Sequence, residues 1–173
     1  MQPFDFHIQD VLPLLNDAAL FLEHVTTWVM VGPPPEDPND DWSFRTGSIQ
    51  TVQDAESGNT LVLEPNYEVR LLKKAQPGPF QDTILVGRST TSDVVIPDTS
   101  ISKLHMRIRL EAATVADANS SNGTTYNDVK LKADEVVPLT DASTLLLGER
   151  SFFLFSPEKF RTLLLKSIGQ MPR

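Results

Sequence analysis

Short apolar runs recur along the chain from Leu61 onward, separated by turn-forming residues such as Gly, Pro, Asn and Asp. The run Met106–Leu110 alternates apolar and basic residues, the pattern of a half-exposed antiparallel strand. Many short strands with turns between them favour a β-sandwich or barrel. The runs predicted to form strands are 61–63, 69–72, 83–86, 94–96, 106–110, 114–116, 144–147 and 152–155.

An earlier stretch has a different periodicity. Between Val11 and Val29, apolar residues recur with a spacing of three to four, which predicts an amphipathic helix over residues 11–30. Asp10 stands at the position expected for its N-cap. The apolar face has two interpretations: the helix docks on the core of its own domain, which we favour, or it forms a dimerisation or partner-docking surface.

The end of the chain predicts a second helix. Ser156 suits the N-cap, Pro157 the first helical position and Gly169 the stop. The apolar stripe of this helix consists of Phe160, Leu163, Leu164 and Ile168.

Residues 32–60 separate the first helix from the strands. The stretch 32–41 is rich in proline and acidic residues, cannot hold a helix and has little to bury, which is typical of a solvated linker. The sequence therefore predicts four segments: an N-terminal amphipathic helix (1–31), an acidic Pro-rich linker or extension (32–60), a β-rich domain (61–157), and a C-terminal helix and tail (158–173).

The composition excludes several kinds of site. The 173 residues include no cysteine, so disulfides, thiolate nucleophiles and Cys-based zinc sites are ruled out. The net charge of −8 is uneven: residues 1–60 hold one base and ten acids, residues 61–157 ten and twelve, and residues 158–173 four and one. This balance argues against nucleic-acid binding, while the near-neutral central part leaves room for a local basic site.

The N-terminus does not have the pattern of a secretory signal. Met1–Asp10 contains no positively charged region, and Asp17, Glu23 and His24 interrupt the apolar stretch that follows. We therefore expect a cytoplasmic protein without membrane insertion.

Polar clusters follow several predicted strands. Arg88 comes directly after the strand 83–86 and offers a planar fork of donors with a permanent charge. Ser102 and Ser121 add hydroxyl groups, and Lys103 adds a mobile cation. This set of donors suits an oxyanion.

The pair Asn122-Gly123 adds a tight turn, which can aim successive backbone amides at an anion. Loops at one pole of a sandwich can converge, so the polar clusters could meet there. A phosphate ester, with close to two negative charges and three acceptor oxygens, matches such a group of donors.

These residues, in this order and spacing, resemble the forkhead-associated (FHA) domain. The resemblance covers residues 61–156, more than half of the chain. Each motif is weak alone, but all of them occur in register. The matching motifs are Gly87-Arg88, Ser102-x-x-His105, Asp117-x-x-Ser120-x-Asn122-Gly123-Thr124-x-x-Asn127, Leu139-x-Asp141 and Leu147-Gly148.

The resemblance implies a mainly β fold, an antiparallel β-sandwich of the FHA/SMAD-like type with binding loops at one end. It implies that Arg88 and Ser102 hold the phosphate of a phosphothreonine peptide and that Lys103 and Ser121 add contacts to the phosphate or the peptide. Asn122 would fix the peptide main chain and help frame a pocket for the threonine methyl group. The residues expected to shape the loops without contacting ligand are Gly87, His105, Gly123 and Asn127.

Two positions depart from the family pattern. Lys103 stands where many members have arginine, so a bidentate contact becomes a point charge. Asp128 stands where glycine is common, which puts the turn after Asn127 in question.

No residue is assigned to catalysis, to a metal or to a cofactor. Ser102 and His105 invite a Ser–His interpretation, but three residues apart on one loop is a poor geometry and no orienting acid is indicated. His7 and His24 lie far from His105 in the sequence and form no metal-ligand cluster with it. We therefore expect a binding protein, not an enzyme.

Two threonines before the β-rich domain are possible phosphorylation sites. FHA domains often favour Asp or a branched aliphatic residue three positions after the phosphothreonine, and Thr51 with Asp54 or Thr46 with Ile49 fits this preference. Phosphorylation could let this segment occupy the site of its own domain or of a neighbour. We favour the alternative that both are ordinary linker threonines.

Taken with the resemblance, the sequence predicts an adaptor that recruits a threonine-phosphorylated partner and responds to a Ser/Thr kinase. The main alternative is a phosphorylation-independent assembly subunit that binds through its sheet faces or helices. A homodimer through the N-terminal helix belongs to that alternative. A third is the regulatory part of a larger enzyme complex, with catalysis on another chain.

Overall fold

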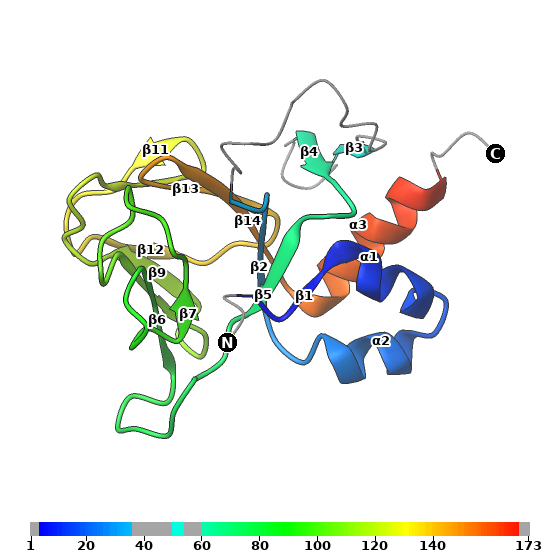
Figure 1. The fold of residues 1–173 in the computed structure, drawn as a ribbon, viewed down its shortest axis with the longest axis horizontal. Helices are drawn as coiled ribbons and strands as arrows, with labels where there is room; N and C mark the ends of the chain where they lie inside the picture. Colours follow the sequence, from blue (N-terminus) through cyan, green and yellow to red (C-terminus); the bar gives the residue numbers. More distant parts are fainter. Residues whose placement is uncertain (1–3, 36–49, 54–59, 170–173) are drawn as a thin grey trace.

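The computed structural model describes residues 4–35, 50–53 and 60–169. Two β-sheets pack against each other, and helices cover the remaining part of the larger sheet (Figure 1). This architecture confirms the mainly β sandwich, with helices towards both ends of the chain, that the sequence predicted.

The strands are assigned to sheets as follows. The larger sheet has seven, in the order β1 (Phe6–His7), β5 (Glu68–Leu71), β2 (Val29–Gly32), β14 (Arg150–Phe155), β13 (Ser143–Leu147), β10 (Thr124–Tyr126) and β11 (Val129–Lys130). The smaller has five, in the order β12 (Val136–Pro138), β9 (Thr114–Asp117), β8 (Met106–Arg109), β6 (Thr83–Gly87) and β7 (Val94–Val95). The remaining elements are the hairpin of β3 (Gln50–Gln53) and β4 (Thr60–Leu63), the helices α1 (Ile8–Val11), α2 (Ala18–His24) and α3 (Pro157–Gly169), and the 3-10 helix η1 (Leu12–Leu14).

The alternation in β8 places its side chains on opposite faces of the five-stranded sheet. Met106 and Ile108 are buried between the two sheets, while Arg107 and Arg109 lie on the outer face. The strands on either side, β6 and β9, pair with β8 in antiparallel register. The five-stranded sheet therefore has one face in the core and one face open.

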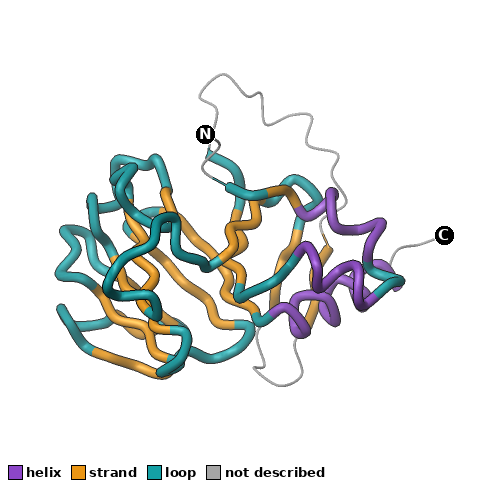
Figure 2. Tube along the Cα trace, turned by 90° about the horizontal axis from the view of Figure 1, so that it is seen from below, coloured by secondary structure: helices purple, strands orange, loops and turns teal. Residues whose placement is uncertain are grey.

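A second core lies between the seven-stranded sheet and the helices (Figure 2). Phe21 of α2, Phe155 of β14 and Phe160 of α3 are fully buried there. The ring centroids of Phe21 and Phe160 are 6.1 Å apart, and those of Phe155 and Phe160 are 5.6 Å apart. This aromatic contact joins the N-terminal helices, the sheet and the C-terminal helix.

The prediction of one continuous helix over residues 11–30 is wrong. The chain forms α1, η1 and α2 in succession and then enters β2. Asp10 is not an N-cap but accepts a 2.8 Å hydrogen bond from the backbone N–H of His7. Asp17 caps α2 by accepting a 3.0 Å hydrogen bond from its first turn. Pro13 in η1 and the cap at Asp17 divide the helical stretch, because proline lacks an N–H donor and the cap starts a new helix.

The residues of β2 explain why the periodicity was misleading. Val29 and Val31 face the core under the helices, and Met30 faces the core between the sheets. β2 pairs with β5 and with β14, so it is central and covered on both faces. An apolar run buried on both faces does not alternate, and periodicity cannot distinguish it from a helical stretch.

The apolar positions of the N-terminal region are used inside the chain itself. Val11, Leu15, Phe21 and Val25 are all buried in the core under the helices, which confirms the interpretation that this region docks on its own domain. β1 and β2 also belong to the same sheet as β5, β10, β11, β13 and β14 of the segment 61–157. Strands from the first and third predicted segments therefore lie in one sheet.

The C-terminal helix begins and ends where the sequence predicted. The hydroxyl of Ser156 accepts a 3.3 Å hydrogen bond from the N–H of Lys159, while its own N–H donates to Asp141 at 2.8 Å. Three members of the predicted stripe are buried, but Ile168 is 38% exposed and lies at the rim. With 13 residues α3 is the longest described helix, and none in the described ranges could cross a lipid bilayer.

The packing of Phe21 leads to a stability prediction. Phe21→Ala should lower the free energy of unfolding by about 3–5 kcal/mol, because it removes a fully buried ring. The matched control is Leu22→Ala on the same helix, where the side chain is 37% exposed and the expected change is within about 0.5 kcal/mol. Chemical denaturation measures both, and equal effects would contradict the assignment of α2 to the core.

Candidate functional site

Three loops that carry the predicted binding residues are joined by hydrogen bonds. The first loop follows β6, the second precedes β8 and the third follows β9. The backbone N–H of Arg88 donates to the carbonyl of Ser102 at 2.9 Å, which joins the first two loops. The N–H of Ser121 donates to the hydroxyl of Ser102 at 2.9 Å, which joins the second loop to the third. The structure therefore brings together residues that are far apart in the sequence.

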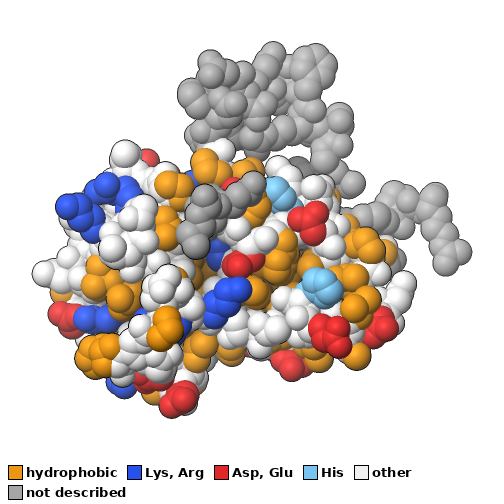
Figure 3. Space-filling view, turned by 60° about the horizontal axis from the view of Figure 1, so that its bottom comes forward, with side chains coloured by type: hydrophobic (Ala, Val, Ile, Leu, Met, Phe, Trp, Pro, Cys, Tyr) orange, Lys and Arg blue, Asp and Glu red, His pale blue; other side chains and the backbone are white. Residues whose placement is uncertain are grey.

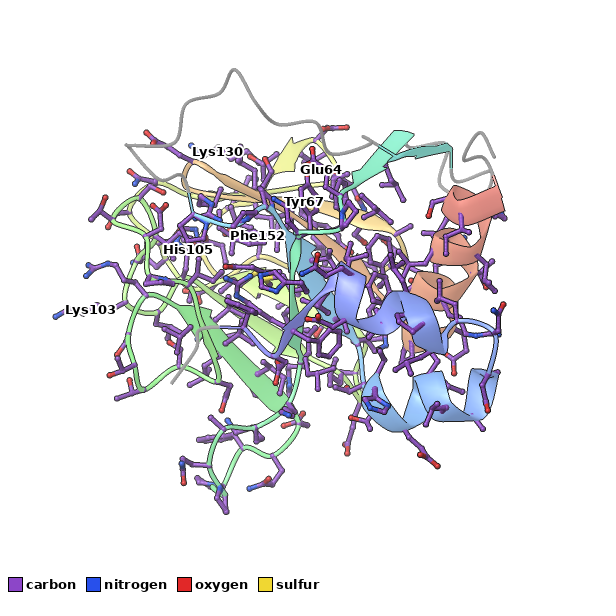
Figure 4. The ribbon with its side chains drawn as sticks, turned by 45° about the vertical axis from the view of Figure 1, so that its right-hand side comes forward. Glu64, Tyr67, Lys103, His105, Lys130 and Phe152 are labelled. Carbon is purple, nitrogen blue, oxygen red and sulfur yellow. The ribbon has the colours of Figure 1, made fainter. Side chains whose placement is uncertain are left out.

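The side chains offered by these loops are mostly exposed. Arg88 donates from Nε to the carbonyl of Ile101 at 3.0 Å, which positions the guanidinium beside the second loop. Lys103 points away from the body of the molecule (Figure 4). Ser121 and Asn122 are also exposed, whereas Ser102 is half-buried. The loops thus present two cations and several hydrogen-bonding groups to solvent.

Asn122 is anchored rather than free. Its side-chain amide donates to the carbonyl of Ser100 at 2.7 Å, across from the third loop to the second. Ser100 is itself held by Asp98, which accepts hydrogen bonds from both its N–H and its hydroxyl. The amide of Asn122 therefore has a defined position at the edge of the site.

His105 ties the loops together from inside the sandwich. The side chain is fully buried (Figure 4), its Nδ1 accepts from the N–H of Ser102 at 3.0 Å, and its Nε2 lies 3.0 Å from the carbonyl of Gly123. Because a backbone N–H can only donate, Nδ1 must be unprotonated, and Nε2 carries the hydrogen given to Gly123. Burial lowers the pKa of His105 below its ordinary value, which agrees with this neutral tautomer.

Asp117 organises the third loop, a role that the sequence analysis did not assign. Its buried carboxylate accepts from the hydroxyls of Ser120 at 2.6 Å and Thr124 at 2.7 Å, and from the N–H of Ser120 at 3.0 Å. Burial alone raises the pKa of Asp117, but these hydrogen bonds outweigh it and hold the pKa below its usual value. The spacing of Asp117 and Ser120 in the sequence, Asp-x-x-Ser, is the signal that could have identified this role.

Two glycines are required by the geometry of the loops. A Cβ atom on Gly87 would lie 2.2 Å from the carbonyl oxygen of Lys103, so the backbones of the first two loops approach too closely for any side chain. Gly123 has a φ of +83°, in the region that glycine adopts without strain. The predicted loop-shaping role of Gly87 and Gly123 stays a prediction, with this geometry in its favour.

The turn after Asn127 forms despite the departure at Asp128. Tyr126 pairs with Val129 across a two-residue hairpin in which Asn127 and Asp128 have φ values of 46° and 65°. The side-chain oxygen of Asn127 accepts from the N–H of Thr144 at 3.0 Å and ties the turn to β13. Asp128 thus takes the left-handed conformation that glycine would otherwise supply.

One of the two possible phosphorylation sites, Thr51, lies away from these loops. The backbone of Thr51 is in β3, paired with Val62 of β4, and this hairpin lies beside α3 at the helical side of the molecule (Figure 1). Thr46 lies outside the described residues. Phosphorylation of either threonine remains a prediction.

Comparison with known proteins places the site within a recognised domain. Residues 84–148 match the model of the FHA domain family. FHA domain-containing protein FhaA of Mycobacterium tuberculosis is 35% identical over 66 residues, which is 37% of this chain and only 12% of the length of that protein. The matched family range contains the whole predicted phosphate site.

Solved structures of FHA domains are also similar. The N-terminal FHA domain of S. cerevisiae Rad53p, in complex with a phosphothreonine peptide, is 20% identical, with 54% of this chain and 88% of that chain covered and a TM-score of 0.44. Mycobacterium tuberculosis EmbR with a low-affinity phosphopeptide is 19% identical, with 61% and 24% covered and a TM-score of 0.40. An FHA domain from Arabidopsis thaliana is 25% identical, with 76% and 87% covered and a TM-score of 0.43.

The close approach at Gly87 yields a prediction. Gly87→Ala should lower the free energy of unfolding by about 1–3 kcal/mol, because the new methyl group collides with a backbone carbonyl that cannot move aside cheaply. Gly78→Ala is the control, since nothing lies within 4 Å of a Cβ there. Thermal or urea denaturation measures the difference, and a neutral Gly87→Ala would refute the close approach.

The buried imidazole predicts a pH dependence. The pKa of His105 is lowered on folding, so below about pH 6.5 the unfolded chain takes up this proton more readily than the folded chain. The stabilisation is complete above that pH and is lost as the pH falls. Urea denaturation at several pH values should show a steeper loss of stability below pH ~6.5 for wild type than for His105→Gln. Parallel pH profiles of the two proteins would contradict the assignment.

Proposed function

Because residues 84–148 of this chain form a forkhead-associated domain, as its motifs predicted, we propose that the chain is a phosphothreonine-dependent adaptor. FHA domains are binding modules that read phosphorylated threonine on partner proteins. The proposed partner is a protein phosphorylated by a Ser/Thr kinase, and the proposed response is recruitment of that partner. The chain itself would not be an enzyme.

The observation that carries the proposal is the convergence of three loops on one group of donors. Arg88 and Lys103 supply two positive charges, and Ser102 and Ser121 of the same hydrogen-bonded loop cluster supply two hydroxyl groups. A phosphate monoester carries nearly two negative charges and three acceptor oxygens, so it complements this set. A fixed cluster is ordered before it binds, which reduces the entropic cost of recognition.

The anchored amide of Asn122 supports a peptide ligand. Its nitrogen is engaged by Ser100 at 2.7 Å, which leaves its side-chain oxygen oriented as an acceptor for a peptide N–H. In this proposal Arg88 and Ser102 hold the phosphate, Lys103 and Ser121 add contacts, and Asn122 fixes the peptide main chain beside the threonine methyl group.

The geometry gives no support to a Ser–His catalytic pair. The ring of His105 contacts the backbone N–H of Ser102, not its hydroxyl, and its other nitrogen is engaged with Gly123. A nucleophilic serine would need its hydroxyl within hydrogen-bond distance of the imidazole. His105 is proposed instead to keep the binding loops in register.

Peptide titration tests the proposal. The purified chain is titrated by calorimetry with a degenerate phosphothreonine peptide library and then with the selected sequence. Micromolar affinity is expected for phosphothreonine, with little binding of phosphoserine or unphosphorylated versions. Arg88→Ala should weaken binding about ten- to hundred-fold, because it removes charge-assisted hydrogen bonds worth ~1.5–3 kcal/mol.

The control for charge alone is Lys166→Ala, an exposed cation on α3. It should leave the affinity unchanged. If no phosphopeptide binds the folded wild-type protein, or if the two variants weaken binding equally, the adaptor proposal fails. The alternative of a phosphorylation-independent assembly subunit would then take its place.

A further inference from the structure

The open face of the five-stranded sheet carries a groove that the phosphate site does not use. Its volume is about 790 Å³. Outward-facing residues of β6, β8 and β9 form the floor, β12 forms one side, and the loop 74–80 forms the other. Leu85 and Ala116 on the floor alternate with residues of the sandwich core, so the groove lies on the outer face.

Exposed apolar side chains gather in this groove. Phe80 is 71% exposed, Val136 is 63% exposed and Leu104 is 38% exposed, and all three line it. Figure 3 shows hydrophobic side chains lying among basic ones on the face of the molecule that it draws. A folded protein rarely leaves several large apolar side chains together in a hollow unless something covers them.

The charged residues of the groove are already neutralised. Arg109 pairs with Asp82 at 3.1 Å, and Lys74 pairs with Asp93 at 2.8 Å. The third cation, Arg107, is paired with Asp134. Because each cation has its own acid within the chain, an uncharged apolar ligand complements the groove better than an acidic or basic one does.

One end of the groove is lined by residues of the loops that carry the candidate phosphothreonine site. Leu104 directly follows Lys103, and Thr91 belongs to the same loop as Arg88. The sheet edge beside the groove is β12, which has three residues and ends in Pro138, so addition of a further strand is disfavoured there. A ligand would therefore bind through its side chains on the face of the sheet.

We propose that this groove binds an uncharged apolar segment of the same partner that carries the phosphothreonine. The inference rests on the proposed function and adds a second point of contact to it. Once the phosphothreonine is bound, the apolar segment is held at high effective concentration beside Phe80 and Val136, so a weak contact adds substantially to the affinity. The ligand class is thus a phosphothreonine peptide with aliphatic and aromatic residues in one flank.

The test compares a short phosphothreonine peptide, selected as above, with the same peptide extended. A Leu-Ile-Phe-Val segment is attached through Gly-Ser linkers of graded length, on either side of the phosphothreonine. At least one extended peptide should bind wild type about tenfold more tightly or better than the short peptide. Calorimetry or fluorescence anisotropy gives the dissociation constants.

Two variants in the groove are compared with a control variant outside it. Val136→Ser and Phe80→Ser should abolish the gain from the extension and leave the affinity for the short peptide unchanged. Val129→Ser should keep the gain, because Val129 is equally exposed, at 63%, but lies on β11 outside the groove.

Other results would overturn the inference. If the short peptide binds and no extension tightens binding, the groove proposal fails while the adaptor proposal stands. If no phosphopeptide binds, both fail together. A concentration-dependent dimer that Phe80→Ser abolishes and Val129→Ser retains would assign the groove to a second copy of the chain instead.

Discussion

His105 has no exposed surface, and each of its ring nitrogens makes a hydrogen bond to the backbone of a different loop. An imidazole buried in this way has to be neutral and in one tautomer, so the donor at Ser102 and the acceptor at Gly123 are both specified. The distance between the second and third loops follows from this bridge. Gly87 adds the complementary constraint on the first loop, whose backbone touches the second without room for a side chain.

In the three loops, the residues that hold the backbone in place are different from the residues that are exposed to solvent. The groups that hold the loops, among them His105 and Asp117, are buried and have their hydrogen bonds satisfied inside the chain. The groups that we propose contact a ligand, among them Arg88 and Lys103, are exposed on the same loops. In the proposed function, exposed side chains would bind an anion from a backbone that is already ordered, an arrangement that favours specificity.

The rest of the molecule supports this end through one shared sheet. The seven-stranded sheet has a core on each face, with β2 contributing Met30 to one and Val29 and Val31 to the other. Within the residues that the structure describes, the five-stranded sheet, in contrast, is covered on one face only. Its open face carries Phe80 and Val136 in one groove, whose lining also includes Leu104, the residue after Lys103.

Local patterns in the sequence predicted a large part of this structure. Alternation in Met106–Arg109, the cap at Ser156 and the motif residues of the loops are short-range features, because they depend on strand pleat, helix-end chemistry and turn geometry. The FHA resemblance followed from such features, and the family match bears it out. The role of Asp117 was visible in its spacing to Ser120 but became clear only with its burial.

Other features depended on contacts between distant segments, so no local pattern could specify them. Val29–Gly32 is a strand because β5 and β14 pair with it on both sides, and an apolar run of that kind is ambiguous in isolation. Ile168 continues the periodicity of α3 but is exposed where the core ends. Periodicity and turn chemistry are properties of neighbouring residues, whereas burial and the meeting of loops depend on which remote segments pack against them.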